Sequence, residues 1–332
     1  MAKVAQVATI AATQSRIFIR AITKLHHVFL WDDVTCVPQA ISFGSIGKDP
    51  GETAVPTIAE KRRAFRKLHE SGCFVIPNPW DVGSARYLQG LGFKALATTS
   101  AGFAFTQGFP DGQFSRDLAL AHCRELAEAT DVPLNVDYEG GYADDPDGVA
   151  ESVRLCVETG IAGLSIEDST GDPNKPLYDF DLALARVKAA RAAIDRAGGD
   201  VVFTARSEGF VRGRPDLAET VRRMKAFADA GADCLYAPGI KTREEIAAVV
   251  AVGKPVNFLM ATATNFSVAD LAGMGVRRIS TGGTLARTAW TGFMGAAREI
   301  AEHGTFKNFE NTIANAELNA FFREDRKARE AS

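Results

Sequence analysis

The feature that most constrains the fold is a regular alternation of short apolar segments with amphipathic ones, beginning at about residue 57. Short apolar segments bounded by turn residues predict eight strands, at residues 73–80, 95–100, 133–139, 163–169, 201–208, 234–240, 255–260 and 277–282. Helical patterns predict intervening helices, at residues 82–91, 116–129, 146–160, 179–197, 215–230, 243–252 and 268–274. Repeated units of strand, helix and strand build parallel sheets.

Eight strands that alternate with helices over about 250 residues match the size of a (β/α)8 barrel, or TIM barrel. A doubly wound open sheet is the structural alternative. Nearly every predicted strand ends in polar residues, among them Asn78 and Glu208, and barrel active sites are assembled at these ends. We therefore predict an α/β fold of the (β/α)8 class over residues 56–332. Two further helices, at residues 285–303 and 308–323, exceed what a barrel needs and could pack on a neighbouring subunit.

Residues 1–55 differ from the rest of the chain. No acidic residue precedes Asp32, and residues 42–56 are rich in Gly and Pro. Acid-poor starts that contain Ser and Thr occur in organelle transit peptides. We predict a poorly ordered N-terminal extension, which is either a targeting segment or sequence foreign to the native protein. Thr57 and Glu60 then predict a capping box at the start of the first helix, which should run to about residue 71.

Composition narrows the class of protein. The chain has 332 residues, of which 46% are apolar and 24% charged, with a net charge of −3. This ordinary globular composition predicts no nucleic-acid partner and no membrane span. We expect a cytoplasmic protein, with organelle targeting by the N-terminal segment left open. The five cysteines form no CxxC pair, and the five histidines fall in the N-terminal segment or in predicted helices, which argues against a His-based zinc site.

Acidic residues follow two neighbouring predicted strands. Asp137 and Glu139 should share one face at the end of the first strand, and Glu167 ends the next. Carboxylates that converge in a water-poor site repel one another, and a hard divalent cation such as Mg2+ relieves that repulsion. The pattern therefore indicates an oxygen-liganded metal site. Two solvated acidic loop starts remain the alternative interpretation.

Other strand ends offer groups for an anionic substrate. Arg206 could pair structurally with the carboxylates, or it could grip a substrate carboxylate or phosphate and stabilise a developing enolate. The turn at residues 98–102, which contains Thr99 and Ser100, offers hydroxyl and backbone N–H groups, although such residues are also ordinary turn chemistry. Asn257 is a further polar candidate at a strand end.

Three loops at the same end carry additional candidates. Asp111 is most simply a turn residue, but it could also reach the water shell of a metal. Residues 170–178, which end at Tyr178, could form a lid over the barrel mouth or a passive connection. Residues 281–284 could bind an anion at a helix N-terminus, or their glycines could only permit a tight turn.

Six motifs, in this order, resemble the isocitrate lyase/phosphoenolpyruvate mutase superfamily over about residues 57–323. They are Pro-Asn-Pro-Trp-Asp-Val-Gly-Ser-Ala (77–85), Thr-Thr-Ser-Ala-Gly (98–102), Phe-Pro-Asp-Gly (109–112), Val-Asp-Tyr-Glu-Gly-Gly-Tyr (136–142), Ile-Glu-Asp (166–168) and Thr-Ala-Arg-Ser-Glu (204–208). The resemblance implies a (β/α)8 barrel that exchanges its last helix between subunits of a homotetramer. It also implies Mg2+, with Mn2+ as an alternative, and small carboxylate substrates that are 2-oxo acids or form enolates.

The resemblance also assigns roles by position. Asp137 looks like the direct metal ligand, while Glu139, which stands where the family has Asp, and Glu167 would hold the metal through water. Asp111 matches an Asp that contacts this water shell. Arg206 matches the Arg that binds the substrate carboxylate. The turn that contacts the substrate carboxylate and oxo oxygen is matched by Ser100, Ala101 and Gly102.

Two departures from the family pattern bear on the activity. The isocitrate and methylisocitrate lyases carry a lid Cys that acts as acid or base, but residues 170–175 contain neither Cys nor His. Residues 234–238 lack the His that phosphonate mutases place near the sixth strand. The chain therefore resembles the shorter branch of the superfamily, which includes oxaloacetate decarboxylase-like and carboxyphosphonoenolpyruvate mutase-like proteins.

The leading functional hypothesis is a Mg2+-dependent carbon–carbon lyase, foremost a 2-oxo acid decarboxylase acting on oxaloacetate or a related acid. Decarboxylation needs an electron sink and a later proton donor, for which Tyr178, Tyr236 or water are candidates. The second hypothesis is P–C bond chemistry of the carboxyvinyl-carboxyphosphonate phosphorylmutase type. A non-enzymatic barrel that only binds a metal and a carboxylate is a third, and the complete set of acidic residues with Arg206 speaks against it.

Overall fold

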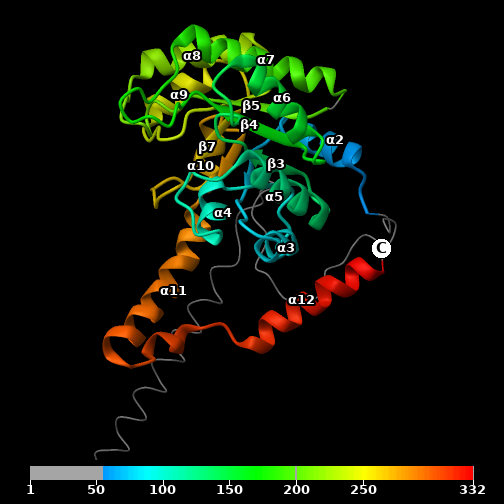
Figure 1. Cartoon of the computed structure of the whole chain (residues 1–332), viewed down its shortest axis with the longest axis vertical. Helices are drawn as coiled ribbons and strands as arrows, with labels where there is room; N and C mark the ends of the chain where they lie inside the picture. Colours follow the sequence, from blue (N-terminus) through cyan, green and yellow to red (C-terminus); the bar gives the residue numbers. More distant parts are fainter. Residues whose placement is uncertain (1–54, 199, 332) are drawn as a thin grey trace, which may run out of the picture. The chain divides into compact units, whose positions relative to one another are not determined.

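The computed structural model describes residues 55–198 and 200–331. Eight parallel strands form a nearly closed barrel, which confirms the predicted (β/α)8 fold (Figure 1). In chain order the strands are β1 (Phe74–Ile76), β2 (Leu96–Ala97), β3 (Leu134–Asp137), β4 (Gly163–Glu167), β5 (Val202–Arg206), β6 (Cys234–Tyr236), β7 (Val256–Leu259) and β8 (Arg278–Ser280). The predicted extension lies outside the described residues, except for Val55.

Helix α2 precedes β1, further helices lie between successive strands, and two more helices with a 3-10 turn follow β8. They are α2 (Ile58–Leu68), α3 (Val82–Gly90), α4 (Ser100–Thr106), α5 (Arg116–Ala129), α6 (Pro146–Val157), α7 (Phe180–Arg196), α8 (Leu217–Asp229), α9 (Arg243–Val250), α10 (Val268–Gly273), α11 (Thr284–His303), η1 (Lys307–Asn311) and α12 (Asn315–Glu330). Thr57 and Glu60 form the predicted capping box of α2.

Three predictions of local structure need correction. Every predicted strand is present, but all eight are shorter than expected, because their ends leave the ladder and become loops. Residues 98–102 are not a simple turn, since Thr99 caps the short helix α4 by accepting a hydrogen bond from the Gly102 N–H. The last predicted helix, at residues 308–323, is instead η1 followed by α12, which extends to Glu330.

The seam of the barrel lies between β1 and β2. The sheet runs in the order β1-β8-β7-β6-β5-β4-β3-β2, so these two strands share no ladder. The Ala97 N–H instead donates to the Pro77 carbonyl at 3.0 Å. Asn78 strengthens the seam because its Nδ2 donates to the Thr98 carbonyl, while its Oδ1 accepts from the Gly282 N–H.

Helix α2 closes the N-terminal end of the barrel. Phe65 is fully buried, and a Cβ built on Gly163 of β4 would lie 2.5 Å from its ring, so glycine is required for this close approach. Inside the barrel, the Arg278 guanidinium donates to Asn257 Oδ1 at 2.8 Å and to Thr204 Oγ1 at 3.1 Å. These contacts fill the lower barrel, so the C-terminal strand ends form its open face.

The C-terminal segment leaves the barrel along α11 and returns along α12, as Figure 1 shows. Asp325 of α12 and Arg86 of α3 are both buried and form an ion pair. Arg86 also reaches Asp131, and Arg329 reaches Asp325. This charged cluster attaches α12 to the barrel. Within residues 55–198 and 200–331, no helix is both long and apolar enough to cross a membrane.

Candidate active site

A cavity of about 270 Å³ opens at the C-terminal ends of the strands. Nine of the predicted site residues line it, namely Thr99, Ser100, Ala101, Asp111, Asp137, Glu139, Glu167, Arg206 and Asn257. The other two, Gly102 and Tyr178, are not part of its lining. The barrel thus brings together residues from segments far apart in the sequence, as its topology requires.

Arg206 lies at the end of β5 and connects the acidic groups. One guanidinium nitrogen, Nη1, pairs with Asp137, while Nη2 lies 3.0 Å from Glu167 and 2.9 Å from Glu208. The guanidinium carbon also lies 4.9 Å from the centre of the Tyr236 ring. Burial acts to lower the pKa of Arg206, but the three carboxylates outweigh it and raise the pKa, so the cation is permanent.

Glu139 lines the cavity but forms no ion pair with Arg206. Its Oε1 is buried and has no hydrogen-bond partner. Burial, followed by the charges of Glu167, Asp137 and Asp111, raises the pKa of Glu139 to about 8. The prediction that Glu139 continues the strand after Asp137 is wrong, because β3 ends at Asp137 and Glu139 has a left-handed φ of 51°. This conformation is strained for a residue with a side chain.

The remaining carboxylates experience the same crowding. Burial and then the charge of Glu208 raise the pKa of Glu167 to about 8, although Arg206 opposes this effect. Burial and then Asp137 also raise the pKa of Asp111. The carboxylates of the site therefore outnumber the arginines that could neutralise them.

Helix α4 begins at the edge of this acidic group. The Ser100 hydroxyl donates to Asp137 Oδ2 at 3.0 Å and lies 3.3 Å from Asp111 Oδ1. Gly102 supports this arrangement from behind the cavity, because a Cβ there would lie 2.6 Å from Thr99 Cγ2 and 3.0 Å from Trp80 Cβ. Small residues are therefore needed where α4 packs against its neighbours.

The donor set fits a hard divalent cation. It offers carboxylate oxygens, an unpartnered buried oxygen on Glu139, and charge repulsion that a cation would relieve. In the described part of the chain, no three His, Cys, Asp or Glu side chains are grouped closely enough to hold a metal among them. Mg2+ usually keeps several waters and is held by one or two carboxylates, so one direct carboxylate ligand with the others acting through water suits it.

Other predicted residues have partners outside the acidic group. The Tyr178 hydroxyl donates to Asp144 at 2.5 Å, away from the cavity lining. Asn257 is buried, and its amide donates to Ser280 Oγ at 2.9 Å. At residues 281–284, the Thr281 and Gly282 N–H groups donate to Asn78 Oδ1 at 2.8 and 2.9 Å. These two amides are therefore already engaged.

Sequence reasoning did not place three charged residues of the cavity in the site, namely Glu208, Arg212 and Arg278. Glu208 stands two positions after Arg206, and this spacing at a strand end could have indicated a shared face. Arg212 follows on the next loop and pairs with Glu167 at 3.1 Å. No strand pattern could have predicted the direction of a loop side chain.

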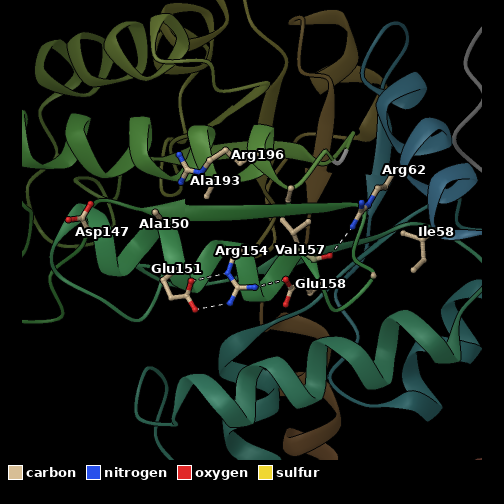
Figure 2. A pocket seen from close by; sticks show the side chains of 12 residues that line it. Ile58, Arg62, Asp147, Ala150, Glu151, Arg154, Val157, Glu158, Ala193 and Arg196 are labelled. Atoms are coloured by element: carbon tan, nitrogen blue, oxygen red, sulfur yellow. Dashed lines mark hydrogen bonds and ion pairs between the residues drawn. The ribbon is translucent and has the colours of Figure 1, made fainter.

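A larger hollow of about 820 Å³ lies among α2, α6 and α7, away from the strand ends (Figure 2). Four of its charged residues are engaged with one another or with the backbone. Arg154 pairs with Glu151 and Glu158, and Arg62 donates to the Val157 carbonyl at 2.8 Å. The smaller cavity, which holds the crowded carboxylates, is therefore the better candidate site.

A model of the phosphoenolpyruvate phosphomutase family matches residues 65–301. The chain belongs to this family. This membership confirms the predicted resemblance to the superfamily that also contains isocitrate lyase, and it supports an enzyme. The activities of individual relatives belong to those proteins.

Three similar proteins illustrate the range within the family. The uncharacterized protein Rv1998c of Mycobacterium tuberculosis is 33% identical over 261 residues, which cover 77% of this chain and 95% of that protein. An oxaloacetate decarboxylase of Paraburkholderia xenovorans is 33% identical over 66% of this chain and 74% of its own. A solved structure of a candidate lyase/mutase from Burkholderia cenocepacia J2315 has 45% identity and a TM-score of 0.78, covering 80% of this chain and 97% of its own.

Proposed function

We propose that this family member is a Mg2+-dependent lyase that cleaves a carbon–carbon bond beside the carbonyl of a 2-oxo acid, with oxaloacetate decarboxylation as the leading activity. The observation that carries this proposal is the permanently charged Arg206, surrounded by Asp137, Glu167 and Glu208 in one cavity. Similarity to a relative named oxaloacetate decarboxylase supports the choice of substrate.

The residues of this chain would divide the work as follows. Asp137 would hold the cation directly, and Glu139 and Glu167 would hold it through water. A bound Mg2+ would supply Lewis acidity at the substrate oxygens. Arg206 and the N-terminal turn of α4 would provide hydrogen-bond donors for the substrate carboxylate and for the negative charge that develops on the oxo oxygen. Because Arg206 is held by three carboxylates, its position is set before substrate arrives.

The loop after β4 favours decarboxylation over reactions that need a lid acid or base. Ser169 and Leu177 form an antiparallel bridge, and the Thr170 hydroxyl donates to the Lys175 carbonyl at 2.5 Å, so the loop is a compact unit. Residues 170–176 contain no Cys and no His. Decarboxylation requires no base to begin, because the leaving carboxylate already carries the electron pair that becomes the new C=O bond of CO2.

Tyr236 is the preferred proton donor for the resulting enolate. It lines the cavity, and burial raises its pKa to about 12, although Arg206 opposes that shift. The hydroxyl therefore keeps its proton at neutral pH until a strongly basic carbon forms nearby. Tyr178 donates to Asp144 instead and is the less suitable of the two.

P–C bond chemistry is the second candidate, and the match to the phosphoenolpyruvate phosphomutase family favours it. The same cavity and the same permanent cation would serve a phosphonate substrate. The position at the end of β6 holds Tyr236 rather than a His, which places phosphonate chemistry second.

The test of the proposed function is pyruvate release from oxaloacetate, measured with Mg2+ and then with EDTA, after subtraction of the metal-catalysed background. Release that needs both the protein and the metal supports the proposal, and Asp137→Asn should abolish it in a folded protein. Absence of release, together with turnover of phosphonopyruvate, would establish the second candidate. Binding of metal and carboxylate without turnover of either substrate would establish the non-enzymatic alternative.

We also propose that the C-terminal segment packs on a second copy of the chain. Large apolar side chains are exposed along α11, η1 and α12, namely Trp290, Phe293, Met294, Phe306, Phe309 and Phe322. The rings of Trp290 and Phe293 are in contact, as are those of Phe306 and Phe309, and exposed apolar groups that gather in this way mark interfaces. The predicted homotetramer with exchanged helices would bury these groups. Light scattering coupled to size-exclusion chromatography tests this proposal, and a monomer at micromolar concentration would exclude it.

A further inference from the structure

Arg212 is a cation at the cavity that the proposed mechanism does not use. It lies on the loop between β5 and α8, and its side chain is 41% exposed. Its Nη2 lies 3.1 Å from Glu167 Oε1, while its Nε lies 3.7 Å from Glu208 Oε2, which is beyond hydrogen-bond length. The guanidinium therefore lines the cavity with part of its surface open to an incoming ligand.

The backbone places Arg212 firmly. The N–H groups of Val211 and Arg212 both donate to the Glu208 carbonyl, at 3.1 and 3.0 Å. The loop also packs closely on the turn after β6, since a Cβ on Gly239 would lie 2.9 Å from Val211 Cγ1. The Glu208 N–H in turn donates to Asp168 Oδ1 at 2.8 Å. The conformation of this loop therefore places Arg212 at the cavity.

The other two arginines of the lining have more of their donors engaged by protein groups. Arg206 pairs with three carboxylates, and Arg278 is buried among Asn257 and Thr204. Among the described residues that line the cavity, Arg212 is therefore the cation best able to accept a further anion. A planar guanidinium suits a carboxylate because it can donate two parallel hydrogen bonds.

We propose that Arg212 binds the distal carboxylate of a four-carbon dicarboxylate, while the groups around Arg206 and α4 hold the 2-oxo carboxylate end. This inference rests on the proposed function and narrows its substrate class to dicarboxylates. Arg212 would be a specificity residue, because it distinguishes a substrate with two carboxylates from one that has a single carboxylate.

The reaction gives Arg212 a distinctive kinetic role. In decarboxylation the C3–C4 bond breaks, its electron pair forms the enolate, and C4 leaves as neutral CO2. The contact between Arg212 and the distal carboxylate is therefore strongest with bound substrate and weakens as the bond breaks. Loss of Arg212 should raise KM about 10- to 100-fold, the equivalent of one charge-assisted hydrogen bond, and should not lower kcat comparably.

Binding of two unreactive 2-hydroxy acids tests the inference without turnover. L-malate has a second carboxylate that L-lactate lacks. Calorimetric titration of the Mg2+-loaded protein with each acid therefore measures how much the second carboxylate contributes to binding. We expect the wild type to prefer malate by about tenfold or more, and Arg212→Gln to remove this preference while lactate binding stays the same. Arg214→Gln is the matched control, since Arg214 is exposed on the same loop and does not line the cavity.

Other outcomes would overturn the inference. Equal weakening of malate and lactate in Arg212→Gln would mean that Arg212 only balances Glu167 and Glu208, and an unchanged preference would remove it from the substrate site. Arg212→Lys retains the charge, so it gives a second measurement if the Gln variant does not fold. If 2-hydroxy-3-phosphonopropanoate bound more tightly than malate, the group that Arg212 binds would be a phosphonate rather than a carboxylate. Failure of oxaloacetate turnover with an intact, Arg212-dependent malate preference would refute the proposed reaction alone.

Discussion

Replacing Glu139 by Gln should stabilise the metal-free protein at alkaline pH, which is unusual for an active-site substitution. Glu139 Oε1 is buried without a partner, and burial with three neighbouring carboxylates raises the pKa from 4.5 to about 8. Between these pH values the folded protein holds a proton that the unfolded chain has lost. Stability therefore falls as the pH rises from 4.5 to 8, and the variant escapes that loss.

The magnitude follows from the shift in pKa. Raising a pKa from 4.5 to about 8 corresponds to roughly 5 kcal/mol at pH 8 and above. Partial solvent access and proton sharing with Glu167 reduce this figure, so we expect Glu139→Gln to gain about 2 to 3 kcal/mol at pH 8. For a chain of this size the gain corresponds to a Tm increase of roughly 5 to 10 °C. At pH 4.5 the gain should vanish.

The assay is thermal unfolding in EDTA across pH 4.5 to 8.5, followed by the same series with Mg2+. The wild type should gain stability from Mg2+ at pH 8, and the variant should gain less, because it has lost one carboxylate. Glu125→Gln, on the exposed face of α5, is the control for removing a negative charge elsewhere. A Glu139→Gln variant that is less stable than wild type at pH 8, or whose gain is the same at pH 4.5 and 8, would refute the reasoning.

Three further predictions concern the scaffold around the site. Gly102→Ala should lower activity and should lower the free energy of unfolding, measured in urea, by about 1 to 3 kcal/mol, because its Cβ would lie 2.6 to 3.1 Å from neighbouring atoms. A fully active and equally stable variant would contradict the packing argument. Burial and then the charge of Arg278 lower the pKa of His69 from 6.5 to about 3. The unfolded chain therefore binds a proton below pH 6.5 that the folded protein does not, and the free energy of unfolding should fall by about 2 kcal/mol between pH 6.5 and 5. His69→Gln should not show this decrease of about 2 kcal/mol. Asp325→Asn should lower the free energy of unfolding by about 3 to 5 kcal/mol, because it leaves the buried Arg86 partly unpaired. Limited proteolysis of this variant should then cut α12 first. Unchanged resistance of α12 to the protease would show that other contacts hold this helix.

Strand number and order could be predicted because each strand carries its own local signal of apolar residues bounded by Gly, Pro or acidic residues. Helix α4 was missed because Gly and Thr in Ser100–Thr106 are poor helix formers, and its stability comes from the Thr99 cap and from packing. The last helix was predicted at residues 308–323 rather than at Asn315–Glu330, because Asp325 is held by Arg86, which is 239 positions away in the sequence, and no local pattern reports such a contact.

The candidate site was predictable to the extent that its residues stand at strand ends. Asp137, Glu167 and Arg206 are placed by β3, β4 and β5, whose registers bring them together. Glu139 was predicted in the cavity for a partly wrong reason, since a left-handed loop rather than a strand face positions it. Arg212 was missed because its direction depends on the loop conformation and on close packing against Gly239.

The bond network of Asn78 has a consequence for how the chain folds during its synthesis. Asn78 follows the first strand, but its Oδ1 accepts from backbone groups beyond the eighth, 203 and 204 positions later. A ribosome must therefore release most of the chain before β8 can join β1 and close the barrel, although the ladders from β2 to β7 can already form. The growing protein would emerge as a curved open sheet with two unpaired edges, and the arrival of β8 would convert it into a barrel.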